Sequence, residues 1–188
     1  MIKRGGAIIL LILNTFNLLA QDNNYGIYKS AEDYKNGKLS CEISAASKGK
    51  IKLHDFFSGK YVDVITYGKN YRFCEDSIFG YRDSKKEDFR FYKTYDKEYR
   101  ILENKDIVVY LGSARISHYN DKHIQFGPAY FFSKTADSPV LPLTILNLKR
   151  AFPENLKFHD MLDMEFGNTQ EINPSDIFKI NQLLNQTK

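Results

Sequence analysis

The chain is poor in cysteine and has no tryptophan, and each shortage limits the chemistry it can perform. Of its 188 residues only two are cysteines, Cys41 and Cys74. They do not form a Cys-x-x-Cys motif, so thiol–disulfide catalysis is not expected. The aromatic residues are 13 Tyr and 14 Phe, a composition typical of strands whose aromatic side chains pack across neighbours.

Long apolar runs are also missing. A membrane-spanning helix needs about 20 consecutive apolar residues, and the run from Ala7 to Leu13 is too short. No second run follows it, so we expect no integral membrane span in the mature protein.

The first 20 residues have the pattern of a secretory signal peptide. Lys3 and Arg4 precede the apolar run, and Ala20 is the small residue that signal peptidase requires, so we expect cleavage between Ala20 and Gln21. No cysteine stands near this site, so a bacterial lipid anchor is not expected. The sequence predicts a soluble product, residues 21–188, that is periplasmic or secreted.

The net charge does not indicate a nucleic-acid partner. The formal charge of +4 falls to +2 when Lys3 and Arg4 leave with the signal peptide. The remaining basic residues are scattered among acidic ones, whereas nucleic-acid binding needs a concentrated basic face.

Export gives the two cysteines a second meaning. In an oxidising compartment an even count favours a Cys41–Cys74 disulfide, which would stabilise the fold by roughly 4 kcal/mol through the loop it closes. The alternative is two free thiols that pack as small apolar side chains. The separation of their Cα atoms decides between the two.

Residues 39–133 alternate between apolar and polar side chains with the period of two that is typical of strands. The connections are too short for crossover helices, so neighbouring strands are expected to be antiparallel. This pattern predicts an antiparallel β-meander, either an open curled sheet or a partial barrel. The expected strands are Ser40–Ala45, Lys50–Phe56, Tyr61–Tyr67, Tyr71–Glu75, Ile78–Arg82, Phe89–Lys93, Glu98–Glu103, Asp106–Leu111, Arg115–Tyr119 and Ala129–Phe132.

Two of these segments allow a statement about the faces of the sheet. In Phe89-Arg90-Phe91 the aromatic side chains share one face, so Arg90 is expected to face water. The segment Ile107–Leu111 is apolar on both faces and is predicted to be a central strand covered on both sides.

Residues 143–187 change to a helical period. Thr144, Asn155 and Ser175 are the expected N-caps of about three helices, and Ser30 caps a short turn near the N-terminus. A run of strands followed by a run of helices predicts an α+β fold, with residues 21–188 forming a single domain.

The histidines are the first candidates for a metal or catalytic site. His118 and His123 flank Asp121 in an expected loop, and two imidazoles with a carboxylate can hold zinc or another divalent ion. Their spacing matches no specific zinc pattern, and a polar hairpin tip is the commoner explanation. His159 and Asp163 share one helix face, either as a ligand pair or as part of a solvated surface.

No motif of known catalytic chemistry is present, and no cofactor is indicated. The segment 112–114, Gly-Ser-Ala, lacks the second glycine of a nucleophile elbow. There is no glycine-rich phosphate loop and no His-Glu-x-x-His helix. Tyr92, Tyr95, Tyr99 and Tyr110 gather around one expected hairpin, where they either clamp a ligand or pack the sheet.

Four short motifs stand out: Leu18-Leu19-Ala20-Gln21, Gly26-Ile27-Tyr28 with Ser30, Asp33 and Gly37, Ile78-Phe79-Gly80-Tyr81-Arg82-Asp83, and Leu148 to Pro153 with Asn155, Lys157 and Phe158. Through these motifs the whole mature chain resembles the small exported proteins common in Bacteroidota, for which no activity is known. The resemblance implies export and a single domain, and it assigns a role to no residue.

Three hypotheses for function follow. The leading one is a non-enzymatic binding or envelope-associated domain, whose partner is a protein or a cell-envelope component. It predicts a contiguous exposed apolar or tyrosine patch on the sheet. The second is a hydrolase or metal-dependent enzyme with an unfamiliar pocket. The third is a carrier of a lipid or small ligand inside the curled sheet, which a solid aromatic core would exclude.

Overall fold

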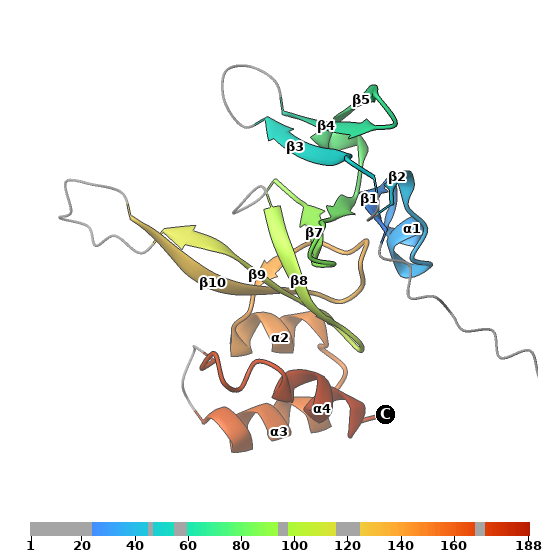
Figure 1. The fold of residues 1–188 in the computed structure, drawn as a ribbon. Helices are drawn as coiled ribbons and strands as arrows, with labels where there is room; N and C mark the ends of the chain where they lie inside the picture. Colours follow the sequence, from blue (N-terminus) through green and yellow to red (C-terminus); the bar gives the residue numbers. More distant parts are fainter. Residues whose placement is uncertain (1–23, 45–46, 55–59, 94–97, 116–124, 168–171) are drawn as a thin grey trace, which may run out of the picture.

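The computed structural model describes residues 24–44, 47–54, 60–93, 98–115, 125–167 and 172–188 (Figure 1). The expected signal peptide with its cleavage site at Ala20 and Gln21 lies outside these residues. The expected metal ligands His118, Asp121 and His123 also lie outside them, so these hypotheses stay predictions.

An eight-stranded antiparallel sheet forms the centre of the molecule, and it curls into an open half-barrel (Figure 1). Its strands lie in the order β11-β10-β9-β8-β7-β6-β1-β2, which confirms the predicted α+β class with an antiparallel sheet. The bounds are β1 Tyr25–Tyr28, β2 Ser40–Ile43, β6 Gly80–Arg82, β7 Asp88–Phe91, β8 Glu98–Asn104, β9 Val108–Arg115, β10 Phe126–Ser133 and β11 Leu141–Pro142.

Three further strands, β3-β4-β5, pair with one another and form a second sheet. It comprises β3 Lys50–His54, β4 Tyr61–Thr66 and β5 Lys69–Cys74, and the short 3₁₀-helix η1, Glu75–Ser77, follows it. The expected antiparallel meander is thus divided between two sheets, with β6 to β11 following one another in the large sheet and β3 to β5 in the small one. The physical reason is the unpredicted strand β1, which pairs with both β2 and β6 and so takes the position beside β6 that β5 would fill in a meander.

Each face of the large sheet has its own cover. The C-terminal helices pack on the face that carries Val109 and Phe132, and the small sheet packs on the other end of that face, against Ile27 and Tyr81. The opposite face carries Tyr110 and is covered by α1 and the segment 134–140. The helices are α1 Ala31–Lys35, α2 Ile145–Ala151, α3 Leu156–Phe166 and α4 Lys179–Asn185.

The predicted helix caps are largely present. The side chains of Ser30, Thr144 and Asn155 accept hydrogen bonds from the backbone of α1, α2 and α3. The expected cap at Ser175 was wrong, because residues 174–178 form turns and α4 begins at Lys179. This arrangement lets Ile177 enter the core from the turn that precedes the helix.

Of the two alternatives for Cys41 and Cys74, the structure has the free thiols and no disulfide between them. Cys41 lies in β2 and packs into the apolar layer between the two sheets. Cys74 ends β5 and is exposed. Because Phe73 faces the inner layer, the alternation of β5 turns Cys74 outward, away from Cys41.

Candidate functional site

The outward face of the small sheet carries charged side chains from all three of its strands. Ile51 and Leu53 of β3 point into the apolar layer between the sheets, so the alternation of the strand turns Lys50, Lys52 and His54 outward. The same rule applies to the other two strands. It places Tyr61, Asp63 and Ile65 of β4, and Asn70, Arg72 and Cys74 of β5, on this outward face.

Asp63 organises the centre of this face. Arg72 donates two hydrogen bonds to its carboxylate, from Nε to Oδ1 at 2.8 Å and from Nη2 to Oδ2 at 3.0 Å. His54 approaches from the other side, with Nε2 at 3.1 Å from Oδ2, as a close contact without the alignment of a hydrogen bond. The hydrogen bonds from Arg72 lower the pKa of Asp63 to about 2.

Tyr61 lies between the two basic side chains. The ring of His54 stacks on it at a centroid distance of 4.5 Å, and the guanidinium carbon of Arg72 lies 3.9 Å from its centroid. His54 and Arg72 come from strands on opposite sides of β4. The column His54–Tyr61–Arg72 is therefore held in place from both flanks, and neither face of the Tyr61 ring is left open.

The charges on this face do not balance. Lys50, Lys52 and Arg72 are basic, whereas Asp63 supplies one carboxylate, which Arg72 already binds. Lys50 and Lys52 are exposed and, among the described residues, enter no ion pair. Side chains two positions apart on a strand repeat about every 6.5 Å, which is twice the rise per residue. The lysines thus form a short, regular cationic row along β3.

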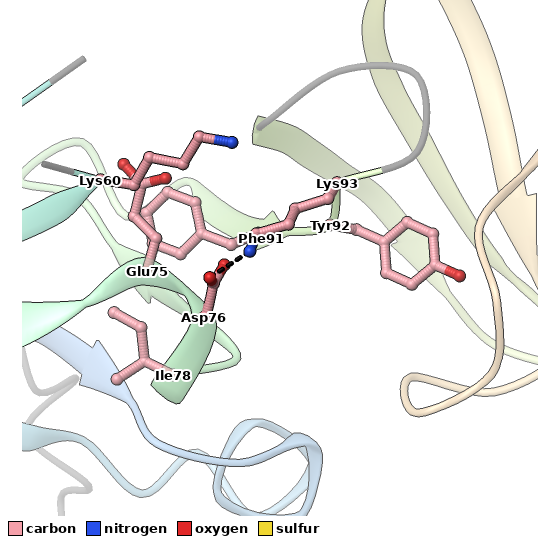
Figure 2. Close-up of a pocket in the computed structure, with 7 residues that line it drawn as sticks. All are labelled: Lys60, Glu75, Asp76, Ile78, Phe91, Tyr92 and Lys93. Carbon is pink, nitrogen blue, oxygen red and sulfur yellow. Dashed lines mark ion pairs between the residues drawn. The ribbon is translucent and has the colours of Figure 1, made fainter. Parts of the chain in front are cut away.

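A pocket of about 440 Å³ lies where the start of β4 and η1 meet the end of β7 (Figure 2). Ile78 and Phe91 line its apolar part. Glu75 and Asp76 lie opposite two lysines, one of which, Lys93, forms an ion pair with Asp76 (Figure 2). Acidic and basic groups are equal in number here, so the charge of the pocket selects no particular class of ligand.

The prediction that Arg90 faces water was wrong, since Arg90 is only 4% exposed. The alternation of β7 is as expected, but α1 and segment 134–140 cover the face on which Arg90 lies. Figure 2 shows the Tyr92 ring turned away from the other labelled side chains. Its centroid lies 5.0 Å from the guanidinium carbon of Arg90.

The remaining candidates from the sequence are not brought together. His159 directs Nε2 to the carbonyl oxygen of Phe152 at 2.9 Å, and Asp163 pairs with Lys149. Tyr99 and Tyr110 are fully buried and pack the sheet; Tyr95 lies outside the described residues. Across the ranges that the structure describes, no group of three or more His, Cys, Asp or Glu residues is arranged to hold a metal ion.

Sequence reasoning missed the cluster of His54, Asp63 and Arg72. Its signal is the alternation of apolar and polar residues in three successive strands, which places all three side chains on one face once the hairpin register is known.

Models of protein families, curated proteins and solved structures give no match to this chain. Within the described residues, every helix is too short or too polar to cross a membrane.

Proposed function

We propose that this protein is an exported, non-enzymatic binding domain that recognises an acidic polysaccharide of the cell envelope through the outward face of its small sheet. The observation that carries this proposal is the exposed row of Lys50 and Lys52 beside Arg72, which Asp63 opposes with a single carboxylate. An anionic polymer supplies the missing negative charge at regular intervals.

The shape of the face favours a polysaccharide over a lipid surface. Proteins that lie on membranes combine basic side chains with apolar ones that enter the bilayer. The apolar side chain expected on this face is Ile65, and it is half-buried. A row of cationic side chains along one strand suits a linear polymer better than a plane of headgroups.

The same face is poorly suited to single-stranded nucleic acid. Such binding relies on aromatic rings that stack on the bases. Tyr61 has His54 on one side and Arg72 on the other, so its ring offers no free stacking surface. The proposed recognition of the polysaccharide accordingly rests on charge, and it does not need the tryptophan that sugar-stacking sites commonly use.

The two alternative functions have less support. A hydrolase would use His54 and Asp63 as a base and its orienting carboxylate, but both oxygens of Asp63 are bound by Arg72. A carrier needs a cavity inside the curled sheet. The fully buried side chains of Tyr99, Tyr110 and Phe132 fill the described part of both faces and argue against one.

The test measures binding of polygalacturonate, a carboxylate polymer, by calorimetry at low ionic strength. The wild-type protein is expected to bind it and to ignore uncharged dextran. Replacing Lys50→Gln and Lys52→Gln together removes the two exposed ion pairs that these lysines form with the polymer in the proposed complex. Each pair is worth about 0.7 kcal/mol, so the affinity falls about tenfold.

The matched control is the pair Lys85→Gln and Lys86→Gln. These lysines are also exposed, but they lie in the turn between β6 and β7. The control is expected to bind as the wild type does. Equal losses in both double variants would show a non-specific charge effect, and binding only to anionic vesicles would identify a membrane surface as the partner; either result refutes the proposal.

Export is tested separately on protein recovered from producing cells. The proposal expects the mature protein outside the cytoplasm with Gln21 as its first residue, as determined by mass spectrometry. Recovery of the protein in the cytoplasm with Met1 retained would contradict it.

A further inference from the structure

Arg90 is a buried charge without a buried partner of opposite sign among the described residues. It lies in β7 at 4% exposure, and within the described ranges it enters no ion pair. Its hydrogen bonds to described residues go to neutral oxygen atoms. Nη1 donates to the hydroxyls of Tyr110 at 2.9 Å and Ser133 at 3.4 Å, and Nη2 donates to the carbonyl oxygen of Ser138 at 2.9 Å.

The phenol of Tyr110 does not neutralise this charge. Burial is the largest influence on Tyr110 and raises its pKa, and Arg90 offsets this only in part. The hydroxyl therefore stays protonated at neutral pH. A buried cation that meets hydroxyls, a carbonyl oxygen and aromatic rings but no anion is costly to the fold, because a fixed charge loses its hydration on burial.

Segment 134–140 covers Arg90. It connects β10 to β11 and contains no helix or strand. Much of its hydrogen bonding is internal: the Thr135 hydroxyl bonds to the side chains of Asp137 at 2.5 Å and Ser138 at 2.6 Å. These hydrogen bonds lie within the segment and do not involve the sheet.

Within the described ranges, the segment meets the rest of the protein through two buried side chains, two backbone carbonyl oxygens and two lysine contacts, in one of which Nζ of Lys134 lies 4.9 Å from the centroid of the Phe152 ring. Ala136 and Val140 are its buried side chains. Ser133 donates to the carbonyl oxygen of Thr135, Arg90 binds the carbonyl oxygen of Ser138, and Asp137 forms an exposed ion pair with Lys35 of α1 at 3.5 Å. A surface pair of this kind contributes little.

We propose that segment 134–140 is a movable strap over an oxyanion site centred on Arg90, which binds a carboxylate, phosphate or sulfate group. The carbonyl oxygen of Ser138 occupies the place of one anion oxygen. When the strap lifts, an oxyanion takes that place and bonds to both terminal nitrogens of the guanidinium, the geometry in which arginine binds such groups best. The hydroxyls of Tyr110 and Ser133, 2.8 Å apart, then turn to donate to the anion.

The rings around Arg90 shape the ligand that this site accepts. The centroids of Phe79, Tyr92 and Tyr110 lie 5.4, 5.0 and 5.8 Å from the guanidinium carbon. These rings surround the guanidinium with aromatic surface, so the anionic group of the ligand points to Arg90 while the body of the ligand leaves under the strap. This site lies on the face of the large sheet that is turned away from the small sheet. The outcome of its test is therefore independent of the test of polysaccharide binding.

The test titrates the purified protein with phosphate, sulfate and acetate in turn, at constant ionic strength, and follows heat. Saturable binding of at least one anion is expected in the wild type, and the three arms show which oxyanion the site prefers. Arg90→Gln is expected to lower the affinity by about tenfold or more, because the two charge-assisted bonds are lost. Arg90→Lys keeps the charge and is expected to bind more weakly than the wild type.

The control variant is Arg100→Gln, which removes an arginine of β8 that pairs with Glu87. It is expected to bind the anions as the wild type does. Absence of saturable binding in the wild type, or unchanged binding in both Arg90→Gln and Arg90→Lys, would overturn the proposal. The second variant keeps the test decisive if Arg90→Gln does not fold.

The movement of the strap is tested by fixing it to α1. Lys35→Cys and Asp137→Cys, made together with Cys41→Ser and Cys74→Ser, are joined with a short bis-maleimide reagent. The cross-linked protein is expected to lose anion binding that the same protein shows before cross-linking. Equal binding before and after cross-linking would show that the strap does not need to move, and would overturn that part of the proposal.

Discussion

Asp63 and Arg72 face each other across β4 and β5 and are joined at two points, Nε to Oδ1 at 2.8 Å and Nη2 to Oδ2 at 3.0 Å. Arg72 is more than half exposed, while the side chain of Asp63 is 7% exposed. The pair therefore covers a buried carboxylate with a surface cation. Arg72 thus also binds the carboxylate that would otherwise balance the positive charge of Lys50 and Lys52 on the outward face.

Replacing Asp63→Asn is expected to lower the free energy of unfolding at neutral pH by about 1–2 kcal/mol, since charge-assisted hydrogen bonds are lost. The pKa of Asp63 in the folded state, about 2, lies below the ordinary value of 3.8. The ionised carboxylate thus stabilises the fold above pH 3.8, and this stability is lost as the pH falls towards 2.

Denaturant unfolding measured across that acidic range checks the prediction. The amide that replaces the carboxylate does not titrate, so the Asp63→Asn protein should lose less stability than the wild type on acidification. Parallel curves for the two proteins would contradict the role given to this ion pair.

The buried side chain of Asn181 joins α4 to the end of the large sheet. Its Oδ1 accepts from the backbone N–H of Ile107 at 2.8 Å, and its Nδ2 donates to Glu103 at 2.6 Å. Asn181→Leu fills similar space but leaves the Ile107 N–H unsatisfied. We expect a loss of about 1–3 kcal/mol in unfolding free energy. The matched change at the exposed Asn185 of the same helix should cost less than about 0.5 kcal/mol.

Alkaline pH is expected to destabilise the fold through buried tyrosines. Burial, with a smaller contribution from Asp88, raises the pKa of Tyr34 to about 12 and raises that of Tyr28 further. The neutral phenols stabilise the fold fully below pH 10, and this stability is lost as the pH rises from 10 towards 12. Tyr34→Phe should show a smaller alkaline loss in denaturant unfolding, and an unchanged loss would contradict this assignment.

The two free thiols are expected to react at different rates. Cys74 is exposed, whereas Cys41 is half-buried and burial raises its pKa. Alkylation of the native protein under non-reducing conditions, followed by mass spectrometry, should modify Cys74 first and Cys41 more slowly. Recovery of unmodified protein that reacts only after reduction would show a disulfide and contradict the structure.

Local signals in the sequence predicted local structure well. Thr144 and Asn155 mark the first turns of α2 and α3 because a cap is a contact over three residues. Ser175 failed as a cap since burying Ile177 takes priority over continuing a helix from that point. The alternation in β7 was also predicted correctly. The sequence did not reveal that Arg90 is covered, because the covering residues lie more than 40 positions away along the chain.

The cluster at Asp63 depends on a register that the sequence did not reveal. The expected strands Tyr61–Tyr67 and Tyr71–Glu75 leave residues 68–70 as the turn between them. That turn would pair Tyr67 with Tyr71 and, by the same register, Asp63 with Glu75. The observed turn is the two-residue Tyr67–Gly68, with both residues at positive φ, and it pairs Asp63 with Arg72 instead. A tyrosine is an unusual residue for that conformation, so the turn could not be recognised from composition.

The most direct test of the proposed function is the salt dependence of polygalacturonate binding. The account predicts that the dissociation constant rises steeply with sodium chloride for the wild type and less steeply for the Lys50→Gln, Lys52→Gln protein, because fewer cations contact the polymer. The Lys85→Gln, Lys86→Gln protein should follow the wild type. A dissociation constant that does not change with salt, or the same slope in all three proteins, would contradict the account.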